Sequence, residues 1–298
     1  MKAILLREVG GPLEIAEVPE PTGADVLEVR AAGINFADVL VRRGLYPQMP
    51  ELPHVLGSEV AGELHGRRVA ALTNRAGGYA EKVAVDPDWT FTLPDEASFA
   101  AGAAFLTTYL TAYIPLVQLR VGERSVVLVH AGAGGVGSAA IQLAKQFGAH
   151  VIATASTEEK RGFARQVGAD EAVAYDELDD LQADVVIDPV GGEIFTRSLT
   201  LLNPLGTIVA IGFAGGTWQD PSVQWLVGRN AAVMGLYLGR LMKLRPDYVR
   251  AAADELVELW RQARIDPVVG HRFPLADAGE ALALIEARRH VGKVVLEP

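Results

Sequence analysis

The chain has 298 residues, half of them hydrophobic, a formal net charge of −10 and no cysteine. The missing cysteines exclude disulfides, thiolate zinc sites and cysteine nucleophiles, and the acidic balance argues against nucleic acid or an anionic membrane as a partner. The N-terminal MKAILLREVGG is charged too early for a signal peptide, and no apolar run is long enough to span a membrane. We therefore expect a cytoplasmic protein with two lobes or one large domain.

The chain up to about residue 95 has the pattern of a β-rich region with irregular loops. Short alternations of apolar and polar residues between turn residues predict strands at Lys2–Glu8, Leu13–Val18, Val26–Ala32, Gly78–Val85 and Trp89–Leu93. The apolar segment Ala97–Val117 follows, and it is long enough for one or two buried helices.

From Ser125 onward, strands and helices alternate. Strands are predicted at Val126–His130, His150–Ala155, Ala172–Tyr175, Asp184–Asp188, Thr207–Phe213 and Ala232–Tyr237. Helices are predicted at Gly137–Phe147, Glu158–Val167, Glu193–Leu202, Gln224–Arg229 and Tyr248–Arg264. This alternation is typical of a doubly wound parallel sheet that binds nucleotides. The end of the chain predicts a strand, a helix over Ala276–Arg289 and a strand over Lys293–Leu296, and we expect it to return to the first lobe.

The segment Val126–Lys145 carries the most informative motif. An apolar strand enters a turn of Ala and Gly, and an amphipathic helix follows at once. The spacing Ala131-x-x-Gly134-x-x-Gly137 removes side chains where a pyrophosphate approaches the backbone N–H groups of a helix N-terminus. The turn lacks the Lys-Ser/Thr ending of a nucleoside-triphosphate loop. We therefore predict a dinucleotide site; the alternative is that the glycines only let the helix pack closely on the sheet.

The end of the next strand bears on the choice of dinucleotide. Sites for NAD usually carry an acidic residue about 20 residues past the first glycines, and this chain has Ala155 there, followed by Ser156. Lys160 and Arg161 are close enough in sequence to pair with a 2′-phosphate. The pattern favours NADP(H) over NAD(H). Ser156 and Glu159 also fit a helix capping box.

Six segments match one protein family in the family's order. They are G-I-N-F-A-D with R-G-L-Y-P (33–47), G-S-E-V-A-G (57–62), L-T-A-Y (110–113), the A-x-x-G-x-x-G turn (131–137), D-P-V-G-G (188–192) and G-K-V-V-L (292–296). Together they make the chain resemble the zinc-free medium-chain dehydrogenases/reductases, specifically the NADPH:quinone oxidoreductases related to zeta-crystallin. The resemblance implies an α/β protein: a Rossmann doubly wound parallel sheet (113–264) plus a mostly β GroES-like catalytic domain (1–112, completed by 265–298).

The chain departs from the zinc-dependent members of this superfamily. Asn35 stands where they carry Cys, Ser58 stands where they carry His, and only Glu59 remains. An open catalytic zinc needs three protein ligands, so we expect no metal. The chain is also shorter than usual between Gly62 and Val69 and over 238–245.

The resemblance implies that Asn35 and Tyr46 line the substrate pocket. Asn35 would donate an amide N–H to a quinone carbonyl oxygen, and Tyr46 would stack on a flat ring or donate its hydroxyl. The alternatives are that Asn35 only caps a turn and that Tyr46 only closes a loop.

Two acidic residues of the same segments are expected to support the structure. Asp38 would hold its loop by hydrogen bonds. Glu59 would be a buried anchor, paired with Arg42 or Arg43. Lys293 would approach the cofactor, although a lysine that opens a strand is often solvated.

The cofactor contacts implied by the resemblance span most of the second half of the chain. The backbone of Gly134, Gly135, Val136 and Gly137 would bind the pyrophosphate, with Thr111 on the nicotinamide side. Ser156 and Lys160 would bind the 2′-phosphate, and Tyr175 would lie beside it unless it is an ordinary strand-end aromatic. Gly212, Phe213 and Arg288 complete the set.

These features predict an NADPH-dependent quinone reductase that uses no metal and acts on a quinone or a similar conjugated carbonyl. An enoyl or alkenal reductase on the same scaffold and an NADPH-binding protein of low turnover are the alternatives. The six histidines show no metal-ligand spacing. The apolar strand Val233–Leu238 needs a cover or a partner, and the resemblance implies a homodimer joined at this edge.

Overall fold

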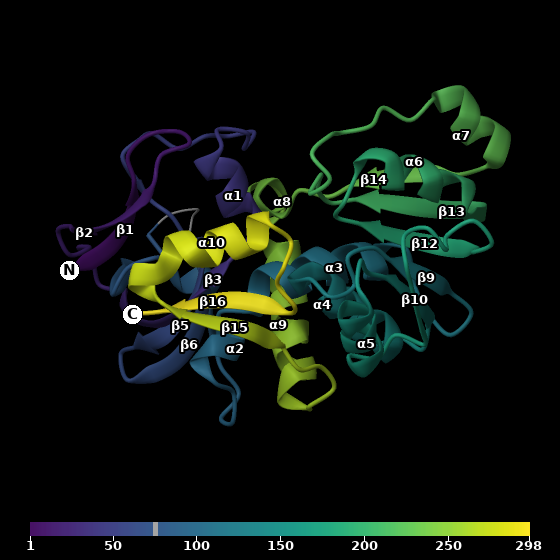
Figure 1. Ribbon diagram of the computed structural model, residues 1–298. Coiled ribbons are helices and arrows are strands. Elements are labelled where there is room, and N and C mark those ends of the chain that lie inside the picture. Colours follow the sequence, from purple (N-terminus) through teal and green to yellow (C-terminus); the bar gives the residue numbers. More distant parts are fainter. Residues whose placement is uncertain (74–76) are drawn as a thin grey trace. The chain divides into compact units, whose positions relative to one another are not determined.

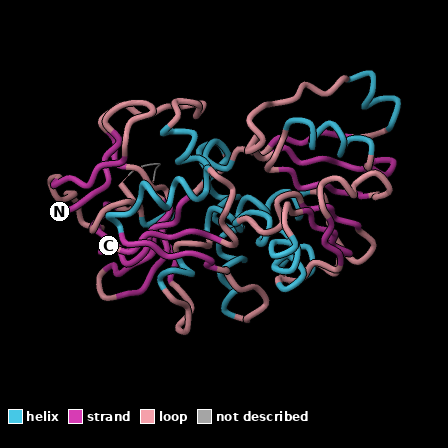
Figure 2. Tube along the Cα trace, viewed as in Figure 1, coloured by secondary structure: helices cyan, strands magenta, loops and turns pink. Residues whose placement is uncertain are grey.

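Two compact units make up the protein in a computed structural model that describes residues 1–73 and 77–298 (Figure 1). Unit 1 comprises Met1–Thr107, Ala253–Arg261 and Asp266–Pro298, and unit 2 comprises Thr108–Ala252 and Gln262–Ile265. Both units combine helices and strands (Figure 2). Among the described residues, no helix has the length and apolar character needed to cross a bilayer.

The described strands of unit 1 form two sheets. The smaller has the order β2-β1-β4, from β1 (Lys2–Leu6), β2 (Leu13–Glu17) and β4 (His54–Val55). The larger has the order β15-β16-β3-β5-β6-β8, with β7 also paired to β3. Its strands are β3 (Val26–Ile34), β5 (Glu59–Leu64), β6 (Arg67–Leu72), β7 (Lys82–Ala84), β8 (Thr90–Thr92), β15 (Val269–Pro274) and β16 (Lys293–Glu297). Because β16 pairs with β3, the end of the chain returns to the first unit, as the sequence predicts.

The helical segments of this unit are short. They are α1 (Phe36–Arg42), the 3₁₀ turns η1 (Pro87–Trp89) and η2 (Leu275–Asp277), α2 (Phe99–Gly102) and α10 (Ala278–Glu286). Residues 253–261, the second half of the longer helix α9 (Pro246–Arg261), also belong to this unit. Sequence reasoning missed α1, because its seven residues were interpreted as loop. The signal was present: Asn35 and Asp38 have the spacing of a helix cap and its third-position acid.

Sequence reasoning also missed β5 and β6. Strand β5 is buried at almost every position, so it lacks the alternation that identifies a half-exposed strand. The two strands form a hairpin in which Leu64 pairs with Arg67. The two turn residues, His65 and Gly66, have φ of 50° and 75°, as a tight hairpin turn requires. This turn accounts for the short segment between Gly62 and Val69.

Unit 2 is built on a six-stranded parallel sheet, which confirms the doubly wound fold. Its order is β11-β10-β9-β12-β13-β14. The strands are β9 (Val126–Val129), β10 (His150–Thr154), β11 (Glu171–Val173), β12 (Ala183–Asp188), β13 (Leu202–Ala210) and β14 (Ala232–Gly235). Strand order reverses between β9 and β12, and ligands of such sheets bind at the carboxyl ends of strands beside the reversal.

The helices between residues 106 and 261 follow the sequence prediction except at one place. They are α3 (Leu106–Gln118), α4 (Gly135–Gln146), α5 (Glu158–Gln166), α6 (Gly192–Thr200), α7 (Val223–Arg229), α8 (Leu238–Leu244) and α9 (Pro246–Arg261). Helix α8 was not predicted and occupies the shortened stretch 238–245. Strand β13 ends at Ala210, before the predicted Phe213, because its pairing with β14 ends there.

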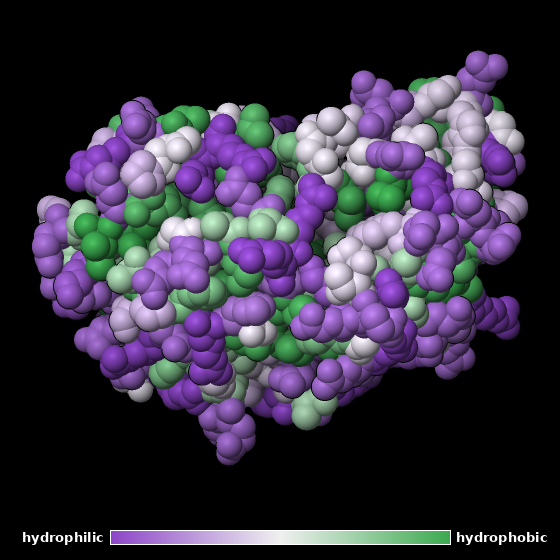
Figure 3. Space-filling model, viewed as in Figure 1, coloured by the Kyte–Doolittle hydropathy of each residue, from purple (hydrophilic) through white to green (hydrophobic). Residues whose placement is uncertain are grey.

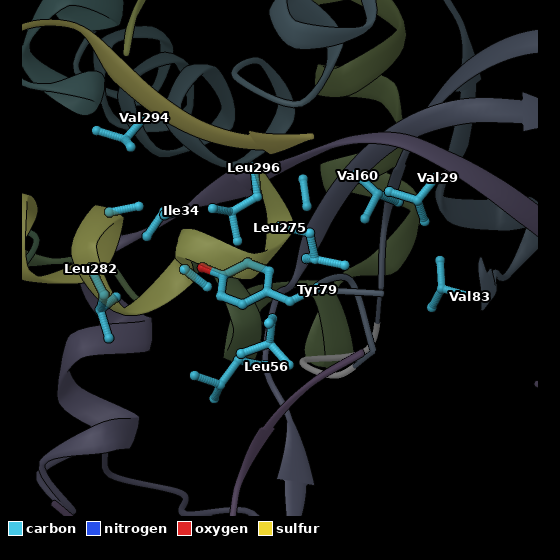
Figure 4. Packing of buried hydrophobic residues seen from close by; sticks show 14 of the residues in the cluster. Val29, Ile34, Leu56, Val60, Tyr79, Val83, Leu275, Leu282, Val294 and Leu296 are labelled. Atoms are coloured by element: carbon cyan, nitrogen blue, oxygen red, sulfur yellow. The ribbon is translucent and has the colours of Figure 1, made fainter. Parts of the chain in front are cut away.

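The core of unit 1 surrounds Tyr79, which is fully buried among aliphatic side chains such as Leu56, Leu275 and Leu296 (Figure 4). Gly57 lies against its ring: a Cβ there would be 2.4 Å from a ring carbon, at a φ of +95°. The Tyr79 hydroxyl donates a 2.8 Å hydrogen bond to Asp38 Oδ2. The same oxygen accepts the Asn35 backbone N–H at 2.8 Å. Asp38 thus has the structural role that the sequence predicts, holding this segment by hydrogen bonds.

Asp38 is an acid in an apolar surrounding. Burial raises its pKa from the usual 3.8 to about 6, and the negative charge of Glu59 adds to the rise. The hydrogen bonds from Asn35 and Tyr79 and the charge of Lys293 oppose the rise but do not cancel it. The folded protein therefore binds the Asp38 proton more tightly than the unfolded chain does.

We expect this proton to make stability depend on pH in one direction. Lowering the pH from above 6 towards 4 stabilises the folded state through Asp38, because its pKa is about 6 when folded and 3.8 otherwise. The shift is worth about 3 kcal/mol at most. Asp38→Asn keeps an acceptor but cannot titrate. Urea unfolding between pH 4 and 7 should therefore show wild-type stability, relative to this variant, falling as the pH rises.

The control variant is Asp86→Asn, which alters the acid that caps η1 through the Asp88 N–H. Its pH profile should match that of the wild type. Identical profiles for the wild type and Asp38→Asn would contradict the buried titration of Asp38.

Candidate active site

Three polar side chains meet inside the larger sheet of unit 1. Asn35 directly follows β3, Glu59 opens β5 and Lys293 opens β16, and these three strands are neighbours in the sheet. Lys293 Nζ lies 2.7 Å from Asn35 Oδ1 and 3.0 Å from Glu59 Oε2. Asn35 Nδ2 is 3.5 Å from the same Glu59 oxygen. The strand register therefore brings an amide, a carboxylate and an ammonium into one cluster, which we call the Asn35 cluster.

The Asn35 cluster is buried and closely packed. Asn35 is 9% exposed, Glu59 0% and Lys293 4%. Glu59 Oε1 accepts the Thr107 backbone N–H at 2.9 Å, so both carboxylate oxygens have partners. Gly33 makes room for this arrangement, because a Cβ there would lie 3.1 Å from Glu59 Oε2 and 2.0 Å from the Ala103 carbonyl oxygen. This contact explains the glycine of the G-x-N motif.

The predicted partners of Glu59 were wrong. Arg42 and Arg43, in and just after the last turn of α1, bind Glu286 at the end of α10, with Arg43 Nε donating at 2.6 Å. Glu59 instead faces the sheet interior, where Lys293 reaches it from 234 residues away in sequence. Lys293 is also only 4% exposed, so the alternative that this lysine is merely solvated is wrong. Only the pairing of β16 with β3 reveals this contact.

The predicted pocket residues Asn35 and Tyr46 both lie in unit 1. Asn35 precedes α1 as its cap residue, so the capping alternative describes its backbone, while its side chain joins the cluster. Tyr46 lies in the loop after α1 and is half-buried. Arg288 follows α10 in the same unit and has a φ of 55°.

The glycine turn of unit 2 has the predicted strand–turn–helix form. Strand β9 ends at Val129, Gly134 is the cap residue of α4, and Gly135 begins the helix. A Cβ on Gly137 would lie 2.2 Å from the Ala131 carbonyl oxygen, so only glycine fits. The N-terminal N–H groups of a helix attract anions. In α4 these groups belong to Gly134, Gly135, Val136 and Gly137, so valine is the largest side chain beside them. The turn therefore fits a dinucleotide pyrophosphate.

A buried histidine fixes the strand end before this turn. His130 Nε2 is 2.6 Å from Ser198 Oγ, and Nδ1 is 2.9 Å from Thr154 Oγ1. Ser198 Oγ donates its one proton to the Ile194 carbonyl, so it must accept from His130 Nε2–H. Burial lowers the pKa of His130 to about 3. The ring is therefore neutral, and His130 ties β9 to β10 and α6.

Tyr175 connects this histidine to the glycine turn. Its ring stacks on His130 with centroids 6.1 Å apart, and its hydroxyl accepts the Ala131 N–H at 3.1 Å. Ala131 has a φ of 51°. Tyr175 lies two residues after the end of β11, and its side chain reaches the glycine turn through this hydrogen bond.

The segment after β10 differs in detail from the sequence prediction. Thr157, and not Ser156, caps α5 by accepting the Lys160 backbone N–H at 3.3 Å, so the predicted capping box is wrong. Exposed Ser156 keeps its hydroxyl outside the cap. Arg161 Nε donates to Glu158 at 2.9 Å, which engages that cation within α5. Burial lowers the pKa of Lys160, so an anion beside it would stabilise its charge.

The remaining cofactor candidates of unit 2 occupy several elements. Thr111 is buried on α3. Gly212 and Phe213 follow β13, and the Phe213 ring packs on Trp218 with centroids 4.7 Å apart. The turn and the residues after β10, β11 and β13 all stand at the carboxyl ends of parallel strands, which lie on one edge of the sheet.

Within residues 1–73 and 77–298, no group of three or more His, Asp or Glu side chains could hold a metal ion. Within the Asn35 cluster, the Glu59 carboxylate contacts the ammonium of Lys293 at 3.0 Å. The Lys293 ammonium, which donates hydrogen bonds to both Asn35 and Glu59, is therefore the cation of this cluster.

Comparisons with known proteins agree with this architecture. Residues 22–74 match the family model of the alcohol dehydrogenase GroES-like domain, and residues 135–258 match that of zinc-binding dehydrogenases. The quinone oxidoreductase of Pseudomonas aeruginosa is 35% identical, with 100% of this chain and 99% of the relative covered.

Solved structures are similar over the whole chain. The quinone oxidoreductase of Thermus thermophilus, described alone and with NADPH, has a TM-score of 0.89 and 37% identity, with both chains fully covered. The Escherichia coli quinone oxidoreductase complexed with NADPH has a TM-score of 0.91 and 30% identity, again with full coverage of both chains. The chain therefore belongs to the quinone oxidoreductase family of the medium-chain dehydrogenases/reductases.

Proposed function

We propose that the protein reduces quinones with NADPH and uses no zinc. The observation that carries the proposal is the Asn35 cluster: at the position where zinc-dependent relatives bind a metal, this chain has an amide, a carboxylate and an ammonium joined by hydrogen bonds. Such a site can polarise a carbonyl oxygen through N–H donors. The names of the relatives and their NADPH complexes support the same substrate and cofactor.

The bound nicotinamide would supply the hydride in this reaction. Negative charge then develops on the quinone oxygen, and an N–H donor already aimed at that oxygen stabilises it. In our proposal Asn35 Nδ2 is this donor. Tyr46 would stack on the quinone ring or donate its hydroxyl. We propose residues 1–112 and 265–298 as the catalytic domain and residues 113–264 as the cofactor domain, in a cytoplasmic enzyme that works where NADPH is supplied.

The proposed cofactor contacts follow from the chemistry of each position. The backbone of Gly134, Gly135, Val136 and Gly137 would hold the pyrophosphate. Ser156 and Lys160 would bind the 2′-phosphate, with Tyr175 beside it. Thr111, Gly212, Phe213 and Arg288 would contact the rest of the cofactor.

The proposal is tested by following oxidation of NADPH and NADH with 1,4-benzoquinone, a larger ortho-quinone and an enal, after treatment with a chelator. We expect turnover with NADPH and a quinone that survives the chelator. Turnover with the enal alone, or tight NADPH binding without any turnover, would contradict the proposal.

We expect Lys160→Met to lower the preference for NADPH over NADH roughly 10- to 100-fold, because a charge-assisted hydrogen bond contributes about 1.5–3 kcal/mol. Ser156→Ala should have a smaller effect in the same direction. The ratio of kcat/KM for the two cofactors measures this preference. The control is Lys243→Met, which alters an exposed lysine on α8. Equal losses with both cofactors would refute a 2′-phosphate contact.

We propose in addition that two copies join at the β14 edge. Among the described residues, β14 has a strand neighbour only on its β13 side. Most of the surface visible in Figure 3 is hydrophilic. In unit 2, however, Val223 and Val227 of α7 are each 73% exposed, and Leu205 of β13 is 84% exposed. An unpaired edge next to exposed aliphatic side chains favours association.

Light scattering tests this assembly. The wild-type protein should have the mass of two chains, and the double substitution Val223→Lys with Val227→Lys should dissociate it. If the dimer buries these two exposed valines, their loss costs about 3 kcal/mol or more, which is roughly a 100-fold weaker Kd. Val9→Lys, at an exposed position of unit 1, is the control. A wild-type mass of one chain would rule out the dimer.

A further inference from the structure

The orientation of the Asn35 amide decides what this side chain can offer. An asparagine has an acceptor oxygen on one side of its amide and two donor hydrogens on the other. Only the donor side can stabilise negative charge on a carbonyl oxygen. A residue that fixes the direction of this amide would therefore decide whether Asn35 can assist quinone reduction.

The ammonium of Lys293 can fix the direction of the Asn35 amide. A lysine ammonium has three donors and no acceptor, and its Nζ lies 2.7 Å from Asn35 Oδ1. If the amide were reversed, its NH₂ group would face the ammonium at that distance, donor against donor. The observed direction is the one in which the amide oxygen accepts from Lys293 and Nδ2 points away from it.

Glu59 favours the same orientation of the Asn35 amide. A carboxylate only accepts hydrogen bonds, and Asn35 Nδ2 is the amide atom that approaches it, at 3.5 Å. This long contact uses one amide hydrogen. Among the residues that the structure describes, Nδ2 makes no other hydrogen bond, so its second hydrogen is available to a ligand.

The backbone holds Lys293 in place. Its N–H donates to the Val268 carbonyl at 3.0 Å, and the next residue, Val294, pairs with Ile34 beside Asn35. Glu59 is anchored independently by the Thr107 N–H. Little reorganisation is then needed when charge develops on a bound substrate, which is the condition for strong electrostatic stabilisation.

We propose that Lys293 is a positioning residue for the reduction: it fixes the Asn35 amide with a donor hydrogen towards the substrate and polarises that donor through Oδ1. The proposal rests on the proposed function, in which Asn35 donates to the quinone oxygen. It also identifies the ligand of the cluster as a hydrogen-bond acceptor, such as a carbonyl oxygen.

A double-mutant cycle tests the proposal. Asn35→Ala should lower the kcat for benzoquinone about 100-fold, as expected for loss of one oxyanion donor, and Lys293→Met roughly tenfold. Since Lys293 acts through Asn35, the double variant should be no slower than Asn35→Ala alone. Losses that multiply in the double variant would overturn the proposal. The KM for NADPH should stay constant throughout.

Three further variants separate positioning from folding. Lys293→Arg keeps the donors and should recover most of the lost kcat. Glu59→Gln combined with Lys293→Met removes both buried charges, so a folded protein with reduced kcat is expected even if the single methionine variant unfolds. Lys82→Met removes a surface ion pair with Glu20 and should leave kcat unchanged.

A second readout does not depend on turnover. In protein labelled with ¹⁵N-asparagine, the Asn35 side-chain amide is identified by its absence in Asn35→Ala. Its two proton shifts should move in Lys293→Met and return towards the wild-type values in Lys293→Arg. If the wild type reduces no quinone, the proposed function fails, but the proton shifts still test the contact between Lys293 and Asn35. Asn35 amide shifts that do not change in Lys293→Met would overturn the positioning role of Lys293.

Discussion

The buried contact of Lys293 with Glu59 and Asn35 is the interaction on which the account of unit 1 depends. It joins three neighbouring strands, β16, β3 and β5, that are far apart in sequence. A buried ion pair costs desolvation energy, and a pair of apolar residues is often as stable in its place. The fold alone gives no reason for this pair. Its proximity to the Asn35 amide supplies one, because a fixed amide is a better hydrogen-bond donor than a mobile one.

In unit 2 the main constraint is the space that a bound dinucleotide requires. A dinucleotide needs free backbone N–H groups at a helix N-terminus, and side chains must stay out of the approach. Gly137 meets this need because no Cβ fits against Ala131. The neutral His130 fixes the end of β9 through Thr154 and Ser198, and Tyr175 fixes the turn by accepting the Ala131 N–H. The turn is thus preformed by packing and hydrogen bonds within the protein.

Much of this could be predicted from the sequence, for identifiable reasons. The six strands of unit 2 contain short apolar runs, most of them separated by helices, and the glycine spacing has a direct steric cause. The β5–β6 hairpin and α1 were missed because full burial removes alternation from β5 and because α1 is only seven residues long. Glu59 was given the wrong partner because sequence proximity favoured Arg43, whereas strand pairing decides the contact. The cap of α5 was assigned one residue too early because Ser156 and Thr157 have the same chemistry.

Hydride transfer to a quinone at a site without zinc is the central claim, and an isotope effect tests it most directly. Chelator-treated protein would be mixed with benzoquinone and NADPH deuterated at the transferred C4 position, and a single turnover would be followed by absorbance. The account predicts slower oxidation of the deuterated cofactor, with the isotope effect retained and the rate further reduced in Asn35→Ala. Oxidation at the same rate for both cofactors and both proteins would contradict it.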